Sequence, residues 1–227
     1  MVGSSDASPR RPNVWVNCAA SLDGRLAFAG GKRAPLSCPE DLERVQHLRA
    51  RADAILVGVG TVVKDDPSLR VHWELLGRPP GKNPTRIVVD ASGRTPVNAR
   101  VLDGSTATII ATSERSTRVF PPHVRTVVAG ATRVDLGRLF TTLFELGIRN
   151  LMVEGGAEIL STVLRAGLFD RFSIYYAPIL IGGATAPPVM SGPETHGPDD
   201  AVSLELVGFE RVGVGSLATY VPQGRKG

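Results

Sequence analysis

Short apolar stretches alternate with amphipathic stretches along most of the chain, and this alternation is typical of an α/β protein. Runs rich in Val and Ile predict strands, and apolar residues spaced three and four apart predict helices. The expected strands are residues 14–17, 54–59, 86–90, 106–112, 125–129, 151–153 and 172–180. The last apolar segments, residues 204–210 and 213–221, predict an antiparallel hairpin that turns around Arg211 and Val212.

The first expected helix has a capping signal at its start. Ser37 and Glu40 have the spacing of a capping box, in which each side chain bonds the backbone N–H of the other residue. The helix that follows would bury Leu42, Val45 and Leu48 on one face.

Later helices are marked at both ends. Asp135 is a suitable N-cap and Gly147 a suitable stop, and a further helix from about residue 157 to 166 would end at Gly167. The apolar face of the helix after Asp135 consists of Leu136, Leu139, Phe140 and Leu143. Strands and helices in this order predict a largely parallel sheet with helices on both faces and an antiparallel C-terminal edge.

Length and composition fit one folded domain. The chain has 227 residues, of which 42% are hydrophobic and 21% are charged, and this is enough to bury a substantial core. We expect residues 12–221 to form a single domain between disordered tails at residues 1–11 and 222–227. No apolar run is as long as a membrane span, and the N-terminus lacks the apolar segment of a secretory signal.

Much of the formal net charge of +4 comes from the two ends of the chain, which carry Arg10, Arg11, Arg225 and Lys226. The body of the chain is therefore nearly neutral, and it has no basic stripe with interleaved aromatic residues. This pattern disfavours nucleic-acid binding. A few local cations suit a small phosphorylated compound better.

Cysteines and histidines indicate no metal site and no covalent nucleophile. The two cysteines, Cys18 and Cys38, lie in no CxxC or Cys/His cluster, so we expect free thiols in a reducing cytoplasm. The four histidines are scattered, and no Ser or Cys sits in a nucleophile elbow, which disfavours a hydrolase. Hydride transfer needs no such set, because a cofactor brings the hydride and the protein supplies position and exclusion of water.

The most informative local feature is the segment 153–157, where a strand runs into Gly155 and Gly156 and then into a helix. Glycines let the backbone approach a phosphate, and a helix N-terminus offers free N–H groups. The same pattern also occurs as a plain tight connection, and there is no GxGxxG fingerprint. Glu154 stands at the carboxyl end of the strand, where it could bond an amino-pyrimidine edge, handle a proton, or simply bond nearby backbone.

Two further segments follow expected strands. In residues 58–67, Thr61 offers a hydroxyl, and residues 65–67 read as a polar turn more than as a magnesium site, because adjacent carboxylates point apart. In residues 20–27, the Asp23–Gly24 pair is a turn signal.

Several cations are candidates for phosphate contacts. Lys32 and Arg33 lie in a Gly-rich loop, where they are either phosphate ligands or solvated surface charges. Arg49 falls near the end of the first helix, with a surface role as its alternative.

Taken in order, these segments resemble the 2,5-diamino-6-ribosylamino-4(3H)-pyrimidinone 5′-phosphate reductases of riboflavin biosynthesis, in the stand-alone form typical of archaea. They are also similar to the reductase half of the bacterial bifunctional riboflavin deaminase/reductase. The likeness runs from about Val14 to Val221. The strings that carry it are residues 21–27, 37–50, 55–67, 86–90, 153–156, 176–178 and 182–183.

The resemblance implies an α/β fold like that of dihydrofolate reductase, with a mainly parallel central sheet flanked by helices and an antiparallel C-terminal hairpin. It also implies NADPH as cofactor and a homodimer. The implied reaction is hydride transfer to C1′ of the ribosylamino group through its open imine form, which gives the ribitylamine. The substrate would be the diamino pyrimidinone phosphate or its deaminated form.

Residue roles are implied by the same resemblance. Glu154 would be the catalytic carboxylate, and Arg94 would meet the 2′-phosphate that distinguishes NADPH. The implied cofactor-binding residues are Ala20, Thr61, Asp65, Ala91, Ser92, Gly93, Arg94, Val153, Gly155 and Gly156. The implied substrate-binding residues are Arg33, Arg49, Leu69 and His72.

The chain departs from the bacterial pattern at several positions. Bacterial members often carry a serine and an aromatic residue where this chain has Arg33 and Pro35, and they can have an arginine where His72 stands. No zinc-deaminase motif is present. Two alternatives stay open: an NADPH reductase of another pterin or pyrimidine, and a nucleotide-binding module without turnover.

Overall fold

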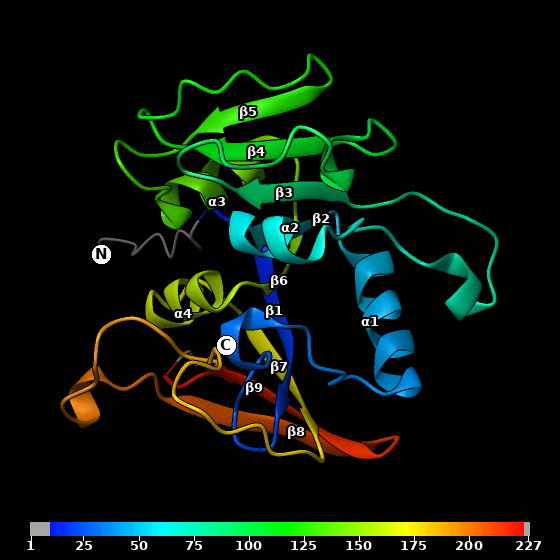
Figure 1. The fold of residues 1–227 in the computed structure, drawn as a ribbon, viewed down its shortest axis with the longest axis vertical. Helices are drawn as coiled ribbons and strands as arrows, with labels where there is room; N and C mark the ends of the chain where they lie inside the picture. Colours follow the sequence, from blue (N-terminus) through cyan, green and yellow to red (C-terminus); the bar gives the residue numbers. More distant parts are fainter. Residues whose placement is uncertain (1–9, 225–227) are drawn as a thin grey trace, which may run out of the picture.

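The computed structural model describes residues 10–224 of the chain. Their strands form one sheet in the order β5-β4-β3-β2-β6-β1-β7-β9-β8, which runs from the top to the bottom of Figure 1. The strands are β1 (Asn13–Ser21), β2 (Ala54–Gly58), β3 (Thr85–Val89), β4 (Thr108–Thr112), β5 (Val124–Val128), β6 (Asn150–Gly155), β7 (Arg171–Ala177), β8 (Leu204–Val212) and β9 (Gly215–Pro222). The helices are α1 (Pro39–Arg51), α2 (Val59–Asp65), α3 (Leu136–Glu145) and α4 (Ala157–Arg165), with short 3-10 turns η1 (Ala29–Gly31), η2 (Trp73–Leu76), η3 (Arg100–Leu102) and η4 (Pro198–Asp200).

Strand directions follow the expected architecture. All neighbours from β5 to β7 are parallel, whereas β9 pairs antiparallel with both β7 and β8. The mainly parallel sheet with an antiparallel C-terminal hairpin is therefore confirmed. β1 is longer than predicted because it continues in register along β7 as far as the pair Ser21–Ala177.

Helices cover both faces of the sheet, as predicted. On one face, α3 and α4 pack on an apolar cluster that includes Leu139 and Leu160. On the other face, α1 and α2 contribute Leu48 and Val62 to a second cluster. Asp135 caps α3 by accepting a 3.0 Å hydrogen bond from the Arg138 backbone, which confirms the predicted start of that helix. The predicted apolar face of α3, Leu136, Leu139, Phe140 and Leu143, is buried.

The predicted capping box of α1 is wrong. The N-cap is Cys38, its side chain makes no capping bond, and Pro39 opens the helix with its fixed φ. Leu42, predicted to be buried, is 43% exposed. The buried residues of α1 are Asp41, Gln46 and Leu48, because polar side chains of this helix bond neighbouring loops and strands instead of packing on a purely apolar surface.

Two local details also differ from the prediction. The segment after β2 forms the short helix α2, and its C-cap Asp66 has the left-handed conformation (φ 39°). Seven residues are too few for a helical period to stand out in the sequence. The C-terminal hairpin turns at Gly213, whose φ is 54°, because Arg211 and Val212 still pair with β9.

Both ends of the chain were predicted to be disordered, in residues 1–11 and 222–227. The Arg11 guanidinium makes two hydrogen bonds to the Asp170 carboxylate, at 2.6 and 2.7 Å, and Pro222 is the last residue of β9. These two boundary residues therefore belong to the packed part of the chain. Residues 1–9 and 225–227 lie outside the described residues. Within residues 10–224, no helix is long and apolar enough to cross a membrane.

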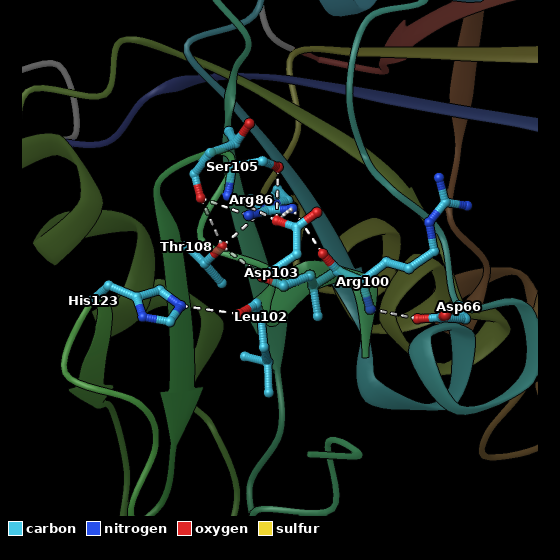
Figure 2. Close-up of polar contacts among 10 residues, drawn as sticks. Asp66, Arg86, Arg100, Leu102, Asp103, Ser105, Thr108 and His123 are labelled. Atoms are coloured by element: carbon cyan, nitrogen blue, oxygen red, sulfur yellow. Dashed lines mark hydrogen bonds and ion pairs between the residues drawn. The ribbon is translucent and has the colours of Figure 1, made fainter. Parts of the chain in front are cut away.

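A buried arginine fixes the loops next to β3 (Figure 2). Arg86 is fully buried, and it donates to Thr108 Oγ1, to the Arg100 carbonyl and to the Asp103 carboxylate, each at 2.9 Å. The Arg100 backbone N–H in turn donates to Asp66 at 2.8 Å. This network ties the end of α2 to η3, so the position of α2 depends on β3 and β4.

Candidate active site

A cavity of about 260 Å³ lies at the carboxyl ends of the central parallel strands. β2 and β6 are neighbours in the sheet, but the chain continues from β2 to β3 on one side and from β6 to β7 on the other. Their carboxyl ends are therefore a topological switch point of the kind that binds ligands in open α/β sheets. The lining residues are Cys18, Ala19, Leu26, Ala27, Gly31, Thr61, Lys64, Asp65, Glu154, Gly155, Gly156, Ala157, Leu160 and Pro187.

Gly155 and Gly156 give this cavity a wall of bare backbone. Their φ values are 146° and 87°, a region that residues with a side chain rarely adopt. A Cβ on Gly156 would lie 3.4 Å from Thr61 Oγ1, so the glycine also allows β6 and α2 to approach each other. Because α4 begins directly afterwards, its first N–H groups and its positive dipole end are available to an anion at the cavity.

Glu154 and Arg49 form an ion pair with two hydrogen bonds. Arg49 Nε donates to Oε1 and Arg49 Nη2 donates to Oε2, both at 2.6 Å, and Arg49 Nη1 donates to the Arg70 carbonyl. The side chains are 10% exposed for Glu154 and 16% for Arg49. The structure therefore brings together the expected catalytic carboxylate and one of the expected substrate-binding residues.

The balance of forces on Arg49 keeps it charged. Burial lowers the pKa of its guanidinium, but the charge of Glu154 and the hydrogen bonds to it outweigh burial, and the pKa is raised above its ordinary value. A guanidinium that stays protonated donates to both oxygens of the Glu154 side chain. Glu154 is thereby suited to accept hydrogen bonds or to stabilise positive charge on a bound molecule.

Helix α2 supplies the opposite wall. Thr61 and Asp65 lie four residues apart on one face of this helix and both line the cavity. Cys18 lines it from β1, and burial raises the pKa of its thiol to about 12, so this sulfur stays protonated and unreactive.

A second cavity, of about 510 Å³, adjoins the first, because both are lined by Ala19 and Leu26. Arg33, one of the expected substrate-binding residues, lines it together with Ser37. Ser37 was predicted only as a helix cap, and nothing in its sequence context distinguished a cavity residue from a capping residue.

Asp23 forms the predicted turn and also holds a distant loop. Its Oδ1 accepts from Ser21 Oγ at 2.6 Å and from the Ile181 backbone at 3.0 Å, and its Oδ2 accepts from Gly182 at 2.7 Å. The bond from Ser21, followed by those from the two backbone N–H groups, lowers the pKa of Asp23 to about 2. The strings 21–27 and 182–183, far apart in the sequence, are thus one structural unit.

Some expected site residues line neither of the two cavities. Ala20 and Val153 are buried in the apolar core on the α4 side, so only their backbone is available to a ligand. Leu69 is 1% exposed in the core on the α1 side, with an unusual φ of 49°. The His72 side chain is 48% exposed, and its Nδ1 lies 2.8 Å from Glu74.

The expected cofactor turn of residues 91–94 follows β3 at the same edge of the sheet, outside the lining of the 260 Å³ cavity. Asp90 builds the turn, since its carboxylate accepts from the backbones of Arg94 at 2.8 Å and Thr95 at 2.7 Å. Gly93 has a φ of 77°, and a Cβ there would collide with Arg118. The Arg94 side chain is exposed.

The chain is similar to several known proteins along most of its length. The model of the RibD C-terminal domain family matches residues 12–218. The 2,5-diamino-6-ribosylamino-4(3H)-pyrimidinone 5′-phosphate reductase of Archaeoglobus fulgidus is 42% identical over 193 residues, covering 80% of this chain and 87% of the relative. The protein of the same name from Methanothermobacter thermautotrophicus is 39% identical over 222 residues, covering 94% of this chain and 100% of the relative.

Among solved structures, the deaminase/reductase of Thermotoga maritima superposes with a TM-score of 0.78 at 25% identity. The match covers 94% of this chain and 57% of that one, so this chain spans little more than half of the bifunctional protein. Fold, cleft and matches together define an α/β oxidoreductase that acts on a pyrimidine. More particularly, the chain belongs to the RibD C-terminal domain family, the reductases of riboflavin biosynthesis.

Proposed function

We propose that the protein reduces the ribosylamino side chain of 2,5-diamino-6-ribosylamino-4(3H)-pyrimidinone 5′-phosphate, or of its deaminated form, to the ribitylamino group with NADPH. The observation that carries the proposal is the ion-paired Glu154 beside the Gly155–Gly156 turn, at the edge of the sheet where such ligands bind. The names of the archaeal relatives supply the substrate class.

The residues present fit a dinucleotide. The Gly155–Gly156 backbone and the start of α4 suit its diphosphate, and Thr61 and Asp65 offer polar groups to a ribose. Arg94, on the turn after β3, suits the 2′-phosphate of NADPH. When bound, NADPH supplies the hydride.

The chain's own contribution is position and charge. The Glu154 carboxylate, held by Arg49, accepts a hydrogen bond from the substrate and stabilises the positive charge of a protonated imine nitrogen. We assign the substrate phosphate to Arg33, which lines the adjoining cavity. Helix α1 holds the loop that contains His72, because Arg49 donates to the Arg70 carbonyl and Gln46 accepts from the His72 backbone.

One assay separates the three candidate functions. NADPH oxidation is followed by absorbance with the ribosylamino-pyrimidine phosphate, with its deaminated form, with dihydrofolate, and with no second substrate. The proposal expects turnover with one or both pyrimidine phosphates. Turnover with dihydrofolate alone would favour a reductase of another pterin, and tight NADPH binding without oxidation would favour a nucleotide-binding module.

We also propose that the protein is a homodimer formed through β8. β8 is one of the two edge strands of the sheet, and its residues 205–211 are all exposed. Leu206, Val207 and Phe209 are 54%, 48% and 68% exposed. An uncovered antiparallel edge pairs readily with a second copy of itself about a two-fold axis, which would bury these side chains.

A cytoplasmic location is part of the same proposal. Both Cys18 and Cys38 are free in the structure, and free thiols persist in reducing compartments. Small-molecule biosynthesis with NADPH is expected in the same compartment.

A further inference from the structure

Lys64 is a cation on the wall of the 260 Å³ cavity that motif and resemblance did not single out. It lies on α2 between Thr61 and Asp65, at spacings of three residues and one residue. Residues three and four apart share a helix face, so Thr61, Lys64 and Asp65 form one polar face toward the cavity. All three line it.

The course of the Lys64 side chain is set by Gly31. A Cβ on Gly31 would collide with the Lys64 ammonium, and the φ of Gly31 is 74°. The side chain therefore lies along the bare backbone of the η1 loop, which lines the same cavity. Among the ion pairs of residues 10–224, none involves Lys64. Its charge is thus available to a ligand.

Without Lys64, the described residues that line the cavity would include two acidic side chains and no lysine or arginine. Of the described residues that line it, Asp65 and Glu154 are acidic, and Lys64 alone is a lysine or arginine. Glu154 is ion-paired with Arg49, whereas no ion pair among residues 10–224 involves Asp65, whose negative charge faces any anion that enters. A dinucleotide carries a doubly charged diphosphate, and an unopposed carboxylate would repel it. Lys64 offsets that charge at the same helix face.

We propose that Lys64 binds the diphosphate of the nicotinamide dinucleotide, opposite the Gly155–Gly156 turn and the first N–H groups of α4. This inference rests on the proposed function and adds a cofactor contact to it. It assigns the diphosphate to Lys64, whereas the 2′-phosphate belongs to Arg94. Gly31 contributes by leaving room for the ammonium group.

The experiment measures nucleotide binding, independently of turnover. Dissociation constants of NADPH and NADH are determined by fluorescence titration for the wild type and for Lys64→Ala, Lys64→Arg and Lys82→Ala. Lys82 is an exposed lysine outside the cavity lining and serves as the matched control. Circular dichroism checks that each variant is folded.

Lys64→Ala should weaken NADPH and NADH by a similar factor of about tenfold, since both carry the diphosphate. Lys64→Arg should retain most of the affinity, and Lys82→Ala all of it. Added salt should reduce the difference between wild type and Lys64→Ala, because exposed charges are screened.

The other outcomes overturn the inference in distinguishable ways. A loss confined to NADPH would move Lys64 to the 2′-phosphate, and unchanged affinities would make it an ordinary solvated lysine. An equal loss in Lys82→Ala would show a general effect of net charge. A wild type that binds neither nucleotide would overturn the proposed function together with this inference.

Discussion

Arg49 on α1 and Glu154 on β6 are separated by 105 residues in the sequence and joined by two 2.6 Å hydrogen bonds in the structure. The pairing arises because α1 covers the face of the sheet toward which the Glu154 side chain points. The helix thereby fixes the orientation of the carboxylate before any ligand arrives, and such preorganisation is what electrostatic catalysis requires.

Glu154→Gln tests the catalytic assignment. The amide keeps the shape of the side chain and loses its charge, so turnover should fall at least about 100-fold. NADPH affinity should stay within about twofold, since the dinucleotide is held mainly by other groups. Steady-state rates and NADPH titration measure the two effects. Glu158→Gln, an exposed substitution in the first turn of α4, is the matched control. Wild-type turnover in Glu154→Gln would reject the role.

Arg49→Met tests the ion pair as a structural unit. It leaves the Glu154 carboxylate, 10% exposed, without its partner, and we expect a loss of about 3 kcal/mol in the free energy of unfolding. The double variant Arg49→Met/Glu154→Gln should lose less than the sum of the two single losses. Urea unfolding of the four proteins gives the coupling, and strict additivity would show that the two groups do not stabilise each other.

Arg94→Ala tests cofactor selection. The turn itself should survive, because Asp90 holds it through the backbones of Arg94 and Thr95. NADPH should therefore bind about tenfold more weakly while NADH binding is unchanged. Fluorescence titration with both nucleotides measures this, and equal losses would count against a 2′-phosphate contact.

Phe209→Glu tests the proposed dimer. A charge on an exposed apolar residue of β8 should oppose burial against a second copy and shift the protein to the monomer. Sedimentation velocity over a range of concentrations measures the oligomeric state. Val119→Glu, at a position that is 87% exposed outside β8, is the control and should leave that state unchanged. A wild type that is monomeric throughout would refute the dimer.

Asp103→Asn tests the acid sensitivity of the Arg86 network in Figure 2. Burial raises the pKa of Asp103, but hydrogen bonds from Ser105 and Arg86 outweigh burial and lower it from 3.8 to about 2. A lowered pKa in the folded state stabilises the protein above pH 4, and this contribution is lost as the pH falls toward 2.

The wild type should therefore be more stable than Asp103→Asn at pH 6, and the difference should shrink between pH 4 and pH 2. Urea unfolding of both proteins at pH 6, 4 and 3 measures it. A difference that does not depend on pH would show that the ionised carboxylate is not what stabilises the network.

Much of the fold could be predicted from local pattern. The apolar strands and the capped helix α3 were found because each carries a complete signal within a few neighbouring residues: the Val- and Ile-rich run of β2, or Asp135 followed by buried leucines. The start of α1 could not be predicted, because Ser37 carries the right chemistry for a cap while Pro39 and the surrounding packing decide where the helix begins.

The candidate site, like the fold, was only partly predictable from the sequence. By itself the sequence determined the architecture, the strand–Gly–Gly–helix turn at Gly155 and Gly156, and the position of Glu154 at a strand end, since these depend on backbone preferences of adjacent residues. Only the tertiary structure decided that Arg49 forms an ion pair with Glu154. It also decided that Leu69 and Val153 are buried in the core and that the Lys64 side chain lies against Gly31. These relations join residues far apart in the chain, and their free energy depends on distance and burial in three dimensions, which local sequence does not encode.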